Sequence, residues 1–371
     1  MHVILIFTYG ISLTSWENSG ILQREIELYK RLQENHGVRF TFLTFGDEVD
    51  EKYNYLIDNL EIIPIYKYVN KSNSKIFDIL KTSFVFIKFK KALPKKAIVK
   101  TNQLNGAWLG LCMKIFLKYP LYLRTGYNLF DFSVKNKKSF PVKVFHYCLT
   151  QMSLFIADIY SVTSSVDRNY LKRNFLNTNN IFVTPNWVID IRENSFEKRI
   201  SNRVLSVGRL EKQKNYYTLI KSFSKSNIGI DIIGEGSLKS SLTQDATNFE
   251  TDLCLLGKLN HNDLNEKYLN YRIFILSSFF EGNPKVVLEA MSKGVLVVAR
   301  DNENIREIIK HNVNGILYDD RDNLNLIVSN LITDKSLIEE LVTKAYIEVK
   351  EINHIDVVIN KELQIYKEIS N

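Results

Sequence analysis

Two glutamates with seven residues between them, Glu281 and Glu289, stand in the stretch SSFFEGNPKVVLEAMSKG. An apolar strand-like run leads into this stretch. Pro284 suits the first turn of a helix, because the N–H that proline lacks would have no intrahelical partner there. The sequence therefore predicts Glu281 in a strand-to-helix loop and Glu289 inside the helix that follows. Ionised carboxylates only accept hydrogen bonds, which makes both residues good ligands for hydroxyl groups.

The loop between the two glutamates is predicted to bind an anion. Gly282 and Asn283 lie at the mouth of the predicted helix, where free N–H groups and the positive end of the helix dipole favour negative charge. Hydroxyl ligands on both sides of an anion site fit a nucleotide sugar, in which a diphosphate joins a sugar to a ribose. The alternative is that Glu281 only stabilises the helix dipole and that Glu289 faces solvent.

Two cations follow another apolar strand, in the run VLSVGRLEKQKN. The strand ends at Gly208, and Arg209 and Lys214 come after it, beside a helix that Asn215 could cap. Two cations in that position can hold a diphosphate, although a solvated loop could also carry both by chance. The glycine turn around Gly234, in IIGEGS, is more typical of a tight strand-to-helix turn than of a ligand site.

Strand-like and helical segments alternate along the whole chain, which predicts an α/β protein with parallel sheets. The expected strands span residues 2–9, 39–45, 97–103, 121–127, 157–164, 203–210, 228–234, 251–257, 272–278 and 294–301. Two such series, in a chain of 371 residues, predict two Rossmann-like doubly wound domains that face each other across a cleft. We expect the first domain over 1–188, the second over 189–350, and a final helix over 351–371 that packs back on the first.

The segments VGRLEKQKN, IIGEGS, EGNPKVVLEAMSKGVLVVARDNENIREII and NGILYDD together resemble the donor domain of the retaining, GT-B-fold glycosyltransferases of glycosyltransferase family 4, with their Glu-x7-Glu motif. The resemblance covers most of the second half of the chain. It implies that Arg209 and Lys214 bind the donor diphosphate, that Glu281 contacts sugar hydroxyls, and that Glu289 contacts the ribose. The implied catalytic residues are Arg209, Lys214 and Glu281. The implied donor-binding residues are Gly20, Gly208, Arg209, Lys214, Gly234, Glu281, Gly282, Asn283, Pro284, Lys285, Val286 and Glu289.

The first half is similar to the same family more loosely. SWENSGILQREIELYKRL resembles its glycine-containing loop and first helix, which would place Gly20 near the diphosphate and the acceptor. Trp187 stands where a glycine is common, and RTGYN stands where many relatives carry an Arg-x-His-Gly-like segment with the usual active-site histidine. Aromatic faces and amides suit sugar binding, although packing or turn formation explains each residue as well. The candidate acceptor-binding residues are Trp16, Asn18, Asn102, Arg124, Tyr127 and Asn128.

The resemblance implies a retaining hexosyl-type transfer by front-face attack. The donor would be a nucleotide sugar, most often UDP-linked in this family, and the acceptor a glycan or lipid-linked sugar in bacterial lipopolysaccharide, capsule or exopolysaccharide synthesis. We find no Asp-x-Asp pair at a strand end, which argues against a Mg²⁺- or Mn²⁺-dependent enzyme. No metal ion or other cofactor is expected, and the two cations would neutralise the leaving diphosphate. The alternatives are a sugar-nucleotide epimerase of GT-B architecture and a basic nucleic-acid-binding protein. The chain shows no evident histidine–carboxylate set for the first and no recognition motif for the second.

Basic residues are concentrated in the Lys71–Lys143 region, which holds 16 of them against only Asp78 and Asp131, in a chain of net charge +8. This surplus predicts an anionic partner, and an anionic membrane surface is expected rather than nucleic acid. Apolar residues at 76, 80, 84 and 87 fit one helix face. That face would either pack on the sheet, with the basic side solvated, or lie on a membrane surface.

The chain is expected to be soluble and cytoplasmic, and peripheral on the inner face of the cytoplasmic membrane. Its longest apolar runs fall short of the roughly 20 residues that a spanning helix needs, and its N-terminus lacks a basic leader. Its three cysteines, Cys112, Cys148 and Cys254, lie in apolar runs without metal or disulfide spacing. They are predicted to be reduced thiols of the core, in a reducing compartment.

Overall fold

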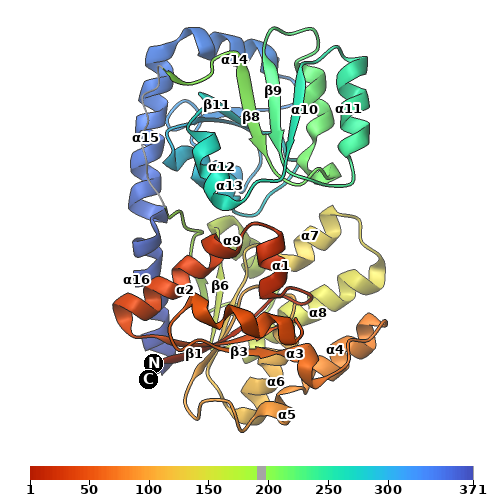
Figure 1. Ribbon diagram of the computed structural model, residues 1–371, viewed down its shortest axis with the longest axis vertical. Coiled ribbons are helices and arrows are strands. Elements are labelled where there is room, and N and C mark those ends of the chain that lie inside the picture. Colours follow the sequence, from red (N-terminus) through yellow and green to blue (C-terminus); the bar gives the residue numbers. More distant parts are fainter. Residues whose placement is uncertain (190–197, 371) are drawn as a thin grey trace. The chain divides into compact units, whose positions relative to one another are not determined.

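The computed structural model describes residues 1–189 and 198–370 and divides the chain into two compact units (Figure 1). The first unit combines Met1–Thr184 with Ile359–Asn371, and the second is Pro185–Val358. The chain thus leaves the first unit once and returns to it in its last helix. The sequence analysis expected the two domain boundaries after residues 188 and 350, whereas the compact units divide after residues 184 and 358.

The first unit is built on a parallel sheet with the strand order β3-β2-β1-β4-β5-β6-β7. Its strands are β1 (His2–Ile6), β2 (Arg39–Thr44), β3 (Glu61–Pro64), β4 (Ile98–Thr101), β5 (Leu121–Arg124), β6 (Ile159–Val162) and β7 (Ile181–Val183). Its helices are α1 (Leu13–Asn18), α2 (Leu22–His36), η1 (Glu48–Leu56), α3 (Ile65–Tyr68), α4 (Lys75–Ser83), α5 (Phe86–Phe89), α6 (Ala107–Leu117), α7 (Leu129–Lys135), α8 (Phe140–Ile156), α9 (Ser165–Asn174) and most of α16 (Ile355–Ser370).

The second unit is built on a parallel sheet with the strand order β10-β9-β8-β11-β12-β13. Its strands are β8 (Arg203–Val207), β9 (Gly229–Ile233), β10 (Leu253–Gly257), β11 (Ile273–Leu276), β12 (Leu296–Arg300) and β13 (Ile316–Tyr318). Its helices are η3 (Lys212–Lys214), α10 (Tyr216–Ser222), α11 (Lys239–Asn248), α12 (His261–Tyr268), α13 (Lys285–Ser292), η4 (Ile305–Glu307), α14 (Leu324–Thr333) and α15 (Lys335–Asn353).

The doubly wound fold class predicted from the sequence is confirmed, because both sheets are parallel and each reverses its strand order once. In the second sheet, successive residues of β8 enter opposite cores: Val204 joins one buried cluster and Leu205 the other. Residues Ile273 and Phe274 of β11 divide in the same way. Alternation between two apolar faces requires helices on both sides of the sheet, which is the doubly wound arrangement.

Every predicted strand lies on an observed one, but three strands were missed. These are β3, β7 and β13, and each is an edge strand of its sheet. Each has only three or four residues. Short edge strands need little burial on both faces, so they lack the continuous apolar run by which the central strands were recognised.

The C-terminal helix α16 is fixed to the first sheet by a buried ion network. The ammonium of Lys100, on β4, donates to Glu362 of α16 at 2.6 Å and to the hydroxyl of Tyr366 at 3.1 Å. Arg124 of β5 reaches the second oxygen of Glu362 at 3.8 Å. Burial lowers the pKa of Lys100 below its usual range, and the carboxylate of Glu362 opposes that shift.

The prediction of three buried core thiols is wrong for two of them. Cys148 and Cys254 are exposed, and Cys112 is half-buried. Cys254 lies on β10, an edge strand, and Cys148 on a solvent-facing side of α8, so an apolar neighbourhood in the sequence did not mean burial. In the described part of the chain, no helix is long and apolar enough to cross a membrane.

Replacing Glu362 should destabilise the first unit, because Glu362→Ala leaves Lys100 and Arg124 buried without their carboxylate. Loss of one partner from a buried ion pair costs about 3–5 kcal/mol of unfolding free energy. Glu368→Ala, at an exposed position of the same helix, is the matched control and should leave stability unchanged. Urea unfolding of both variants tests this, and equal stabilities would show that the network does not fix α16.

Candidate functional site

The candidate donor site lies where β8 and β11 run side by side in the second sheet. These strands are neighbours in space but not in sequence, since β8 is followed along the chain by β9 on its other side. Such a reversal of strand order leaves a crevice at the carboxyl ends of the two strands, where open parallel sheets bind ligands. The loop after β8 carries Arg209 and Lys214, and the loop after β11 carries Glu281.

An ion pair joins these two loops. The ammonium of Lys214 donates to a carboxylate oxygen of Glu281 at 2.6 Å, and the two side chains are only 13% and 10% exposed. A charge-assisted hydrogen bond shielded from water is stronger than one on the surface, so each residue positions the other. The sequence predicted both residues for the site but did not predict that they would touch.

Backbone contacts brace the same two loops on either side of the ion pair. The N–H of Phe279 donates to the carbonyl of Gln213 at 2.9 Å, and the Gln213 side chain donates to the carbonyl of Phe280 at 2.8 Å. The hydroxyl of Ser277 donates to the carbonyl of Lys214 at 2.7 Å. Lys214 and Glu281 are therefore held by a cross-linked pair of loops and not by flexible surface segments.

Two glycines allow the loops after β8 and β9 to pack together. Gly208 and Gly234 have φ angles of +159° and +149°, which side-chain-bearing residues rarely adopt. A Cβ on Gly234 would lie 2.0 Å from the carbonyl oxygen of Gly208, so only glycine fits there. Arg209 follows this contact with an exposed side chain. The geometry gives Gly234 a packing role, and its role in donor binding stays a prediction.

The helix that contains Glu289 begins one residue later than the sequence suggested. Pro284 is the N-cap of α13 instead of a residue of its first turn, and Lys285 is the first helical residue. The carbonyl of Asn283 accepts a hydrogen bond from the Asn186 amide at 2.6 Å, which ties the helix mouth to the segment that enters the second unit. Gly282, Asn283 and Val286 thus surround the start of α13, as predicted for the anion-binding loop.

Glu289 is buried, so the alternative that it faces solvent is wrong. Its side chain is in the core at 3% exposure, and the hydroxyl of Tyr268 donates to it at 3.5 Å. A buried carboxylate is costly unless it is paired or hydrogen-bonded. The structure therefore places Glu289 in the core beside Tyr268, and its role in donor binding stays a prediction.

A cation–π contact at the mouth of α13 could not be predicted from the sequence. The ammonium of Lys285 lies 3.7 Å from the centre of the Trp187 ring, and Trp187 is buried. Trp187 is the residue that stands where the related family commonly has glycine. Its ring therefore supports the side chain of a predicted donor-binding residue, from a position about 100 residues earlier in the sequence.

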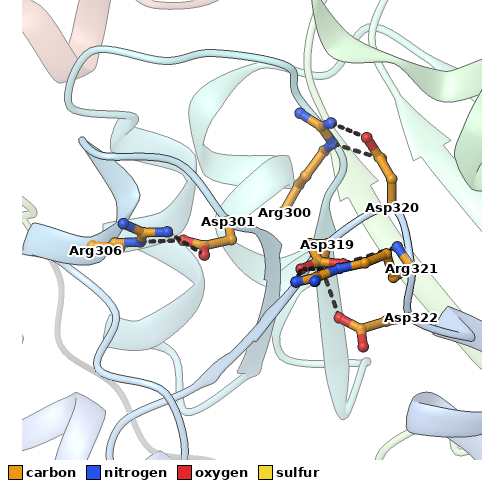
Figure 2. Close-up of polar contacts among 7 residues, drawn as sticks. All are labelled: Arg300, Asp301, Arg306, Asp319, Asp320, Arg321 and Asp322. Carbon is orange, nitrogen blue, oxygen red and sulfur yellow. Dashed lines mark hydrogen bonds and ion pairs between the residues drawn. The ribbon is translucent and has the colours of Figure 1, made fainter.

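Figure 2 shows a set of arginine–aspartate pairs at the carboxyl ends of β12 and β13. Arg300 pairs with Asp320, Arg306 with Asp301, and Arg321 with Asp319. The guanidinium of Arg300 also lies 5.1 Å from the centre of the Phe279 ring, in the loop that carries Glu281. This edge therefore continues the candidate site as a charged rim, which the sequence analysis did not identify.

The expectation that no Asp-x-Asp pair stands at a strand end is wrong. Asp320 and Asp322 form such a pair two residues after β13, and it was overlooked because β13 itself was not predicted. Asp320 is paired with Arg300, and Asp322 accepts a hydrogen bond from the backbone N–H of Asp319 at 2.7 Å. Within the described residues, no group of three or more His, Cys, Asp or Glu side chains could hold a metal ion.

The predicted residues of the first loop are divided between core and surface. Trp16 of α1 is buried, with its ring centre 4.4 Å from that of Phe7, whereas Asn18 is exposed at the end of the same helix. Gly20 has a φ angle of +71° and donates its N–H to the carbonyl of Glu17. Packing accounts for Trp16, and Asn18 is the residue of this loop that is free to meet a ligand.

The remaining acceptor candidates follow β4 and β5, two neighbouring strands of the first sheet. Asn102 and Tyr127 are half-buried, and the ring of Tyr127 packs on Phe132 with 4.6 Å between centres. Asn128 is buried as the N-cap of α7, and Arg124 is buried beside the carboxylate of α16. The structure gives Arg124 and Asn128 clear structural roles, and the assignment of all these residues to an acceptor remains a prediction.

Asn215 caps α10 in a different way from the one that the sequence predicted. Asn215 does occupy the N-cap of α10, but it has a left-handed backbone, and its side chain accepts a hydrogen bond from the Thr218 hydroxyl at 2.7 Å instead of capping a backbone N–H. The hydroxyl of Tyr216 lies close to Gly208, and burial raises the pKa of this tyrosine, which keeps the hydroxyl neutral beneath the loop.

Several known proteins are similar to this chain. Residues 189–348 match the family model described as glycosyl transferases group 1. The amylovoran biosynthesis glycosyltransferase AmsD of Erwinia amylovora is 26% identical over 349 residues, which are 91% of this chain and 92% of that protein. The crystal structure of HepE from Anabaena in complex with UDP has a TM-score of 0.77 at 14% identity, covering 99% of this chain and all of that one.

A third relative is similar over a smaller share of the chain. The N-acetylgalactosamine-N,N'-diacetylbacillosaminyl-diphospho-undecaprenol 4-alpha-N-acetylgalactosaminyltransferase of Campylobacter jejuni is 34% identical over 149 residues, 38% of this chain and 39% of that protein. Fold, site and relatives together define the chain as a glycosyltransferase with the GT-B fold. The match to the glycosyl transferases group 1 model lies within the second unit.

Replacing Gly234 should separate the loops after β8 and β9. Gly234→Ala places a methyl group against the carbonyl of Gly208, and overpacking of this kind costs about 1–3 kcal/mol. Gly257→Ala is the matched control: Gly257 also has a positive φ, of +71°, but has open space around the position of a Cβ. We expect chemical denaturation to show the larger loss for Gly234→Ala, and equal losses would mean that backbone strain alone matters.

Proposed function

We propose that the protein is a retaining glycosyltransferase that transfers a sugar from a UDP-linked donor, without a metal ion, during synthesis of a bacterial surface polysaccharide. The observation that carries this proposal is the Lys214–Glu281 ion pair, held at the crevice between β8 and β11 and next to the start of α13. A cation, a hydroxyl ligand and a helix N-terminus are the groups that a nucleotide sugar requires. HepE, which has the same fold, was solved with UDP, and this supports uracil as the base.

In the proposed donor complex, each charged residue has one task. Lys214 and the exposed Arg209 bind the diphosphate, the N–H groups at the start of α13 bind its oxygens, and Glu281 accepts hydrogen bonds from the sugar. Glu289, buried deeper in α13, accepts from the ribose hydroxyls. Because Lys214 already touches Glu281, the cation and the sugar ligand are set at a fixed separation before the donor arrives.

The proposed reaction breaks the bond between the anomeric carbon and the diphosphate oxygen and forms a bond to the acceptor oxygen on the same face of the sugar. The acceptor proton passes to the leaving diphosphate, so no histidine is needed as a base. Negative charge grows on the leaving oxygen as the old bond breaks, and Lys214 and Arg209 stabilise it. This assignment agrees with a chain in which the usual active-site histidine is replaced by the RTGYN segment.

The proposed acceptor is a sugar attached to a polyprenyl diphosphate. The Campylobacter relative is named for an acceptor of this kind, and AmsD is named for the biosynthesis of a polysaccharide, amylovoran. The Lys71–Lys143 region, with its large excess of cations, suits an acceptor that carries a diphosphate.

Nucleotide binding tests the donor assignment without knowledge of the sugar. UDP should raise the melting temperature, since a ligand at 100 times its Kd adds about 2.7 kcal/mol to the stability of the folded state. GDP, ADP and CMP at the same concentration should have smaller effects, and a single-stranded oligonucleotide none. Stabilisation by the oligonucleotide but not by UDP would exclude the proposed function and favour a nucleic-acid-binding protein.

Turnover of the donor tests the catalytic roles. Lys214→Ala should lower kcat/KM for donor hydrolysis or transfer by roughly 10²–10³-fold, because it removes a group that stabilises charge in the transition state. Lys212→Ala, an exposed cation of the same loop, is the matched control and should retain activity. A chelator should not change the rate, and the product should keep the anomeric configuration of the donor by NMR. Near-normal turnover by folded Lys214→Ala would contradict the proposed clamp.

A further inference from the structure

Helix α4 is oriented with its polar side inward and its apolar side outward. Asp78, Thr82 and Ser83 are its buried residues. On the opposite side Ile76 is 71% exposed and Phe77 63% exposed, and Leu80 is exposed as well. Of the two alternatives for the apolar face of this segment, packing on the sheet is therefore wrong, because the positions that form the face are exposed.

Buried hydrogen bonds fix this orientation. The carboxylate of Asp78 accepts from the hydroxyls of Tyr9 at 2.9 Å and Tyr66 at 2.7 Å, and from the backbone N–H of Ser72 at 2.7 Å. Thr82 accepts from the indole N–H of Trp108 at 3.1 Å. Turning the helix to hide its apolar side would move Asp78 outward and take their acceptor away from the Tyr9 and Tyr66 hydroxyls, so the exposed face is a stable feature of the fold.

The exposed apolar face extends beyond α4. Phe84 follows the helix, and its ring centre lies 5.8 Å from that of Phe116 at the end of α6; both rings are exposed. Helix α6 contacts α4 and also α8 (Figure 1). On α8, Phe140 is 78% exposed, and Val144 and Phe155 continue along the helix at spacings that fall on one side.

Lysines surround this face, and few acidic residues lie among them. Residues 71–96 contain one acid, Asp78, and it is buried. All lysines of this segment are exposed: Lys71, Lys75, Lys81, Lys88, Lys90, Lys91, Lys95 and Lys96. Lys118, Lys137 and Lys138 add exposed charge near the ends of α6 and α8. The docking face, defined as the exposed apolar residues of α4 together with Phe84, Phe116 and these lysines, is thus both apolar and positive.

We propose that the docking face binds an anionic membrane surface. Apolar side chains that project from a basic surface enter the headgroup region of a bilayer, and lysines around them contact lipid phosphates. The surface patch is wider than the segment recognised in the sequence, because Phe116 of α6 lies beside Phe84. Binding to lipid needs neither donor nor acceptor, so this inference goes beyond the proposed transfer and stands apart from it.

The docking face is less suited to bind a second copy of the chain than to bind a membrane. A symmetric dimer through the docking face would place its lysines opposite their own counterparts. Like charges brought together oppose association, whereas an anionic lipid surface neutralises them. The charge of the face therefore favours lipid over self-association.

Vesicle flotation tests the proposal with the full chain. We expect the protein to float with vesicles of phosphatidylcholine and phosphatidylglycerol at low salt, and not with phosphatidylcholine alone. The triple substitution Ile76→Gln, Phe77→Gln and Leu80→Gln should lower the apparent affinity at least tenfold, with the melting temperature unchanged since all three side chains are exposed. Lys90→Glu with Lys91→Glu should weaken binding and its dependence on salt.

The matched control replaces exposed apolar residues of the second unit, Leu326→Gln and Ile347→Gln, which should not affect flotation. No flotation at low salt, or equal flotation of the triple variant, would overturn the proposal. A wild-type dimer in sedimentation velocity that the triple variant abolishes, without vesicle binding, would assign the face to a second copy. Thermal stabilisation by UDP, measured on every variant, separates these results from a failure of the proposed transfer.

Discussion

Lys214 and Glu281 meet because β8 and β11 are neighbours in the sheet although two strands separate them in the chain. The neighbouring loops of the second unit support this contact. The glycine contact between the loops after β8 and β9 leaves room for Lys214, the Gln213 bridges align the two loops, and Pro284 sets where α13 begins. A cation and a carboxylate that are mostly shielded from water need each other, so loss of either side chain would disturb both loops that carry them.

The sequence predicted the two-domain class, the central strands and the residues around α13, because these depend on local signals. Buried parallel strands form continuous apolar runs, and a proline or glycine marks the ends of a helix. It did not predict β13, the Asp-x-Asp pair behind it or the Arg300–Asp320 pair, since a three-residue edge strand leaves too little pattern. The support of Lys285 by Trp187 depends on residues about 100 positions apart, and only the folded chain brings them together.

Residue type alone did not predict which side chains are buried and which are exposed. Arg124, Asn128 and Trp16 were predicted to bind the acceptor, and the structure shows in addition that each is buried in the packing of the first unit, which the sequence did not predict. In α4 the periodic apolar residues indicated a helix correctly, but the side that faces inward was decided by Asp78 and its tyrosine partners. Periodicity fixes which residues share a face, and it does not fix what that face contacts.

The outward apolar side of α4 also affects how the free protein behaves in solution. Rings such as Phe77 and Phe140 in water favour clustering between molecules, and colloidal stability then depends on repulsion between the surrounding lysines. Screening by salt or removal of lysine charge weakens that repulsion while leaving the apolar contact area intact. The same side chains that make the surface attractive to lipid thus set the ionic conditions in which the purified protein stays dispersed.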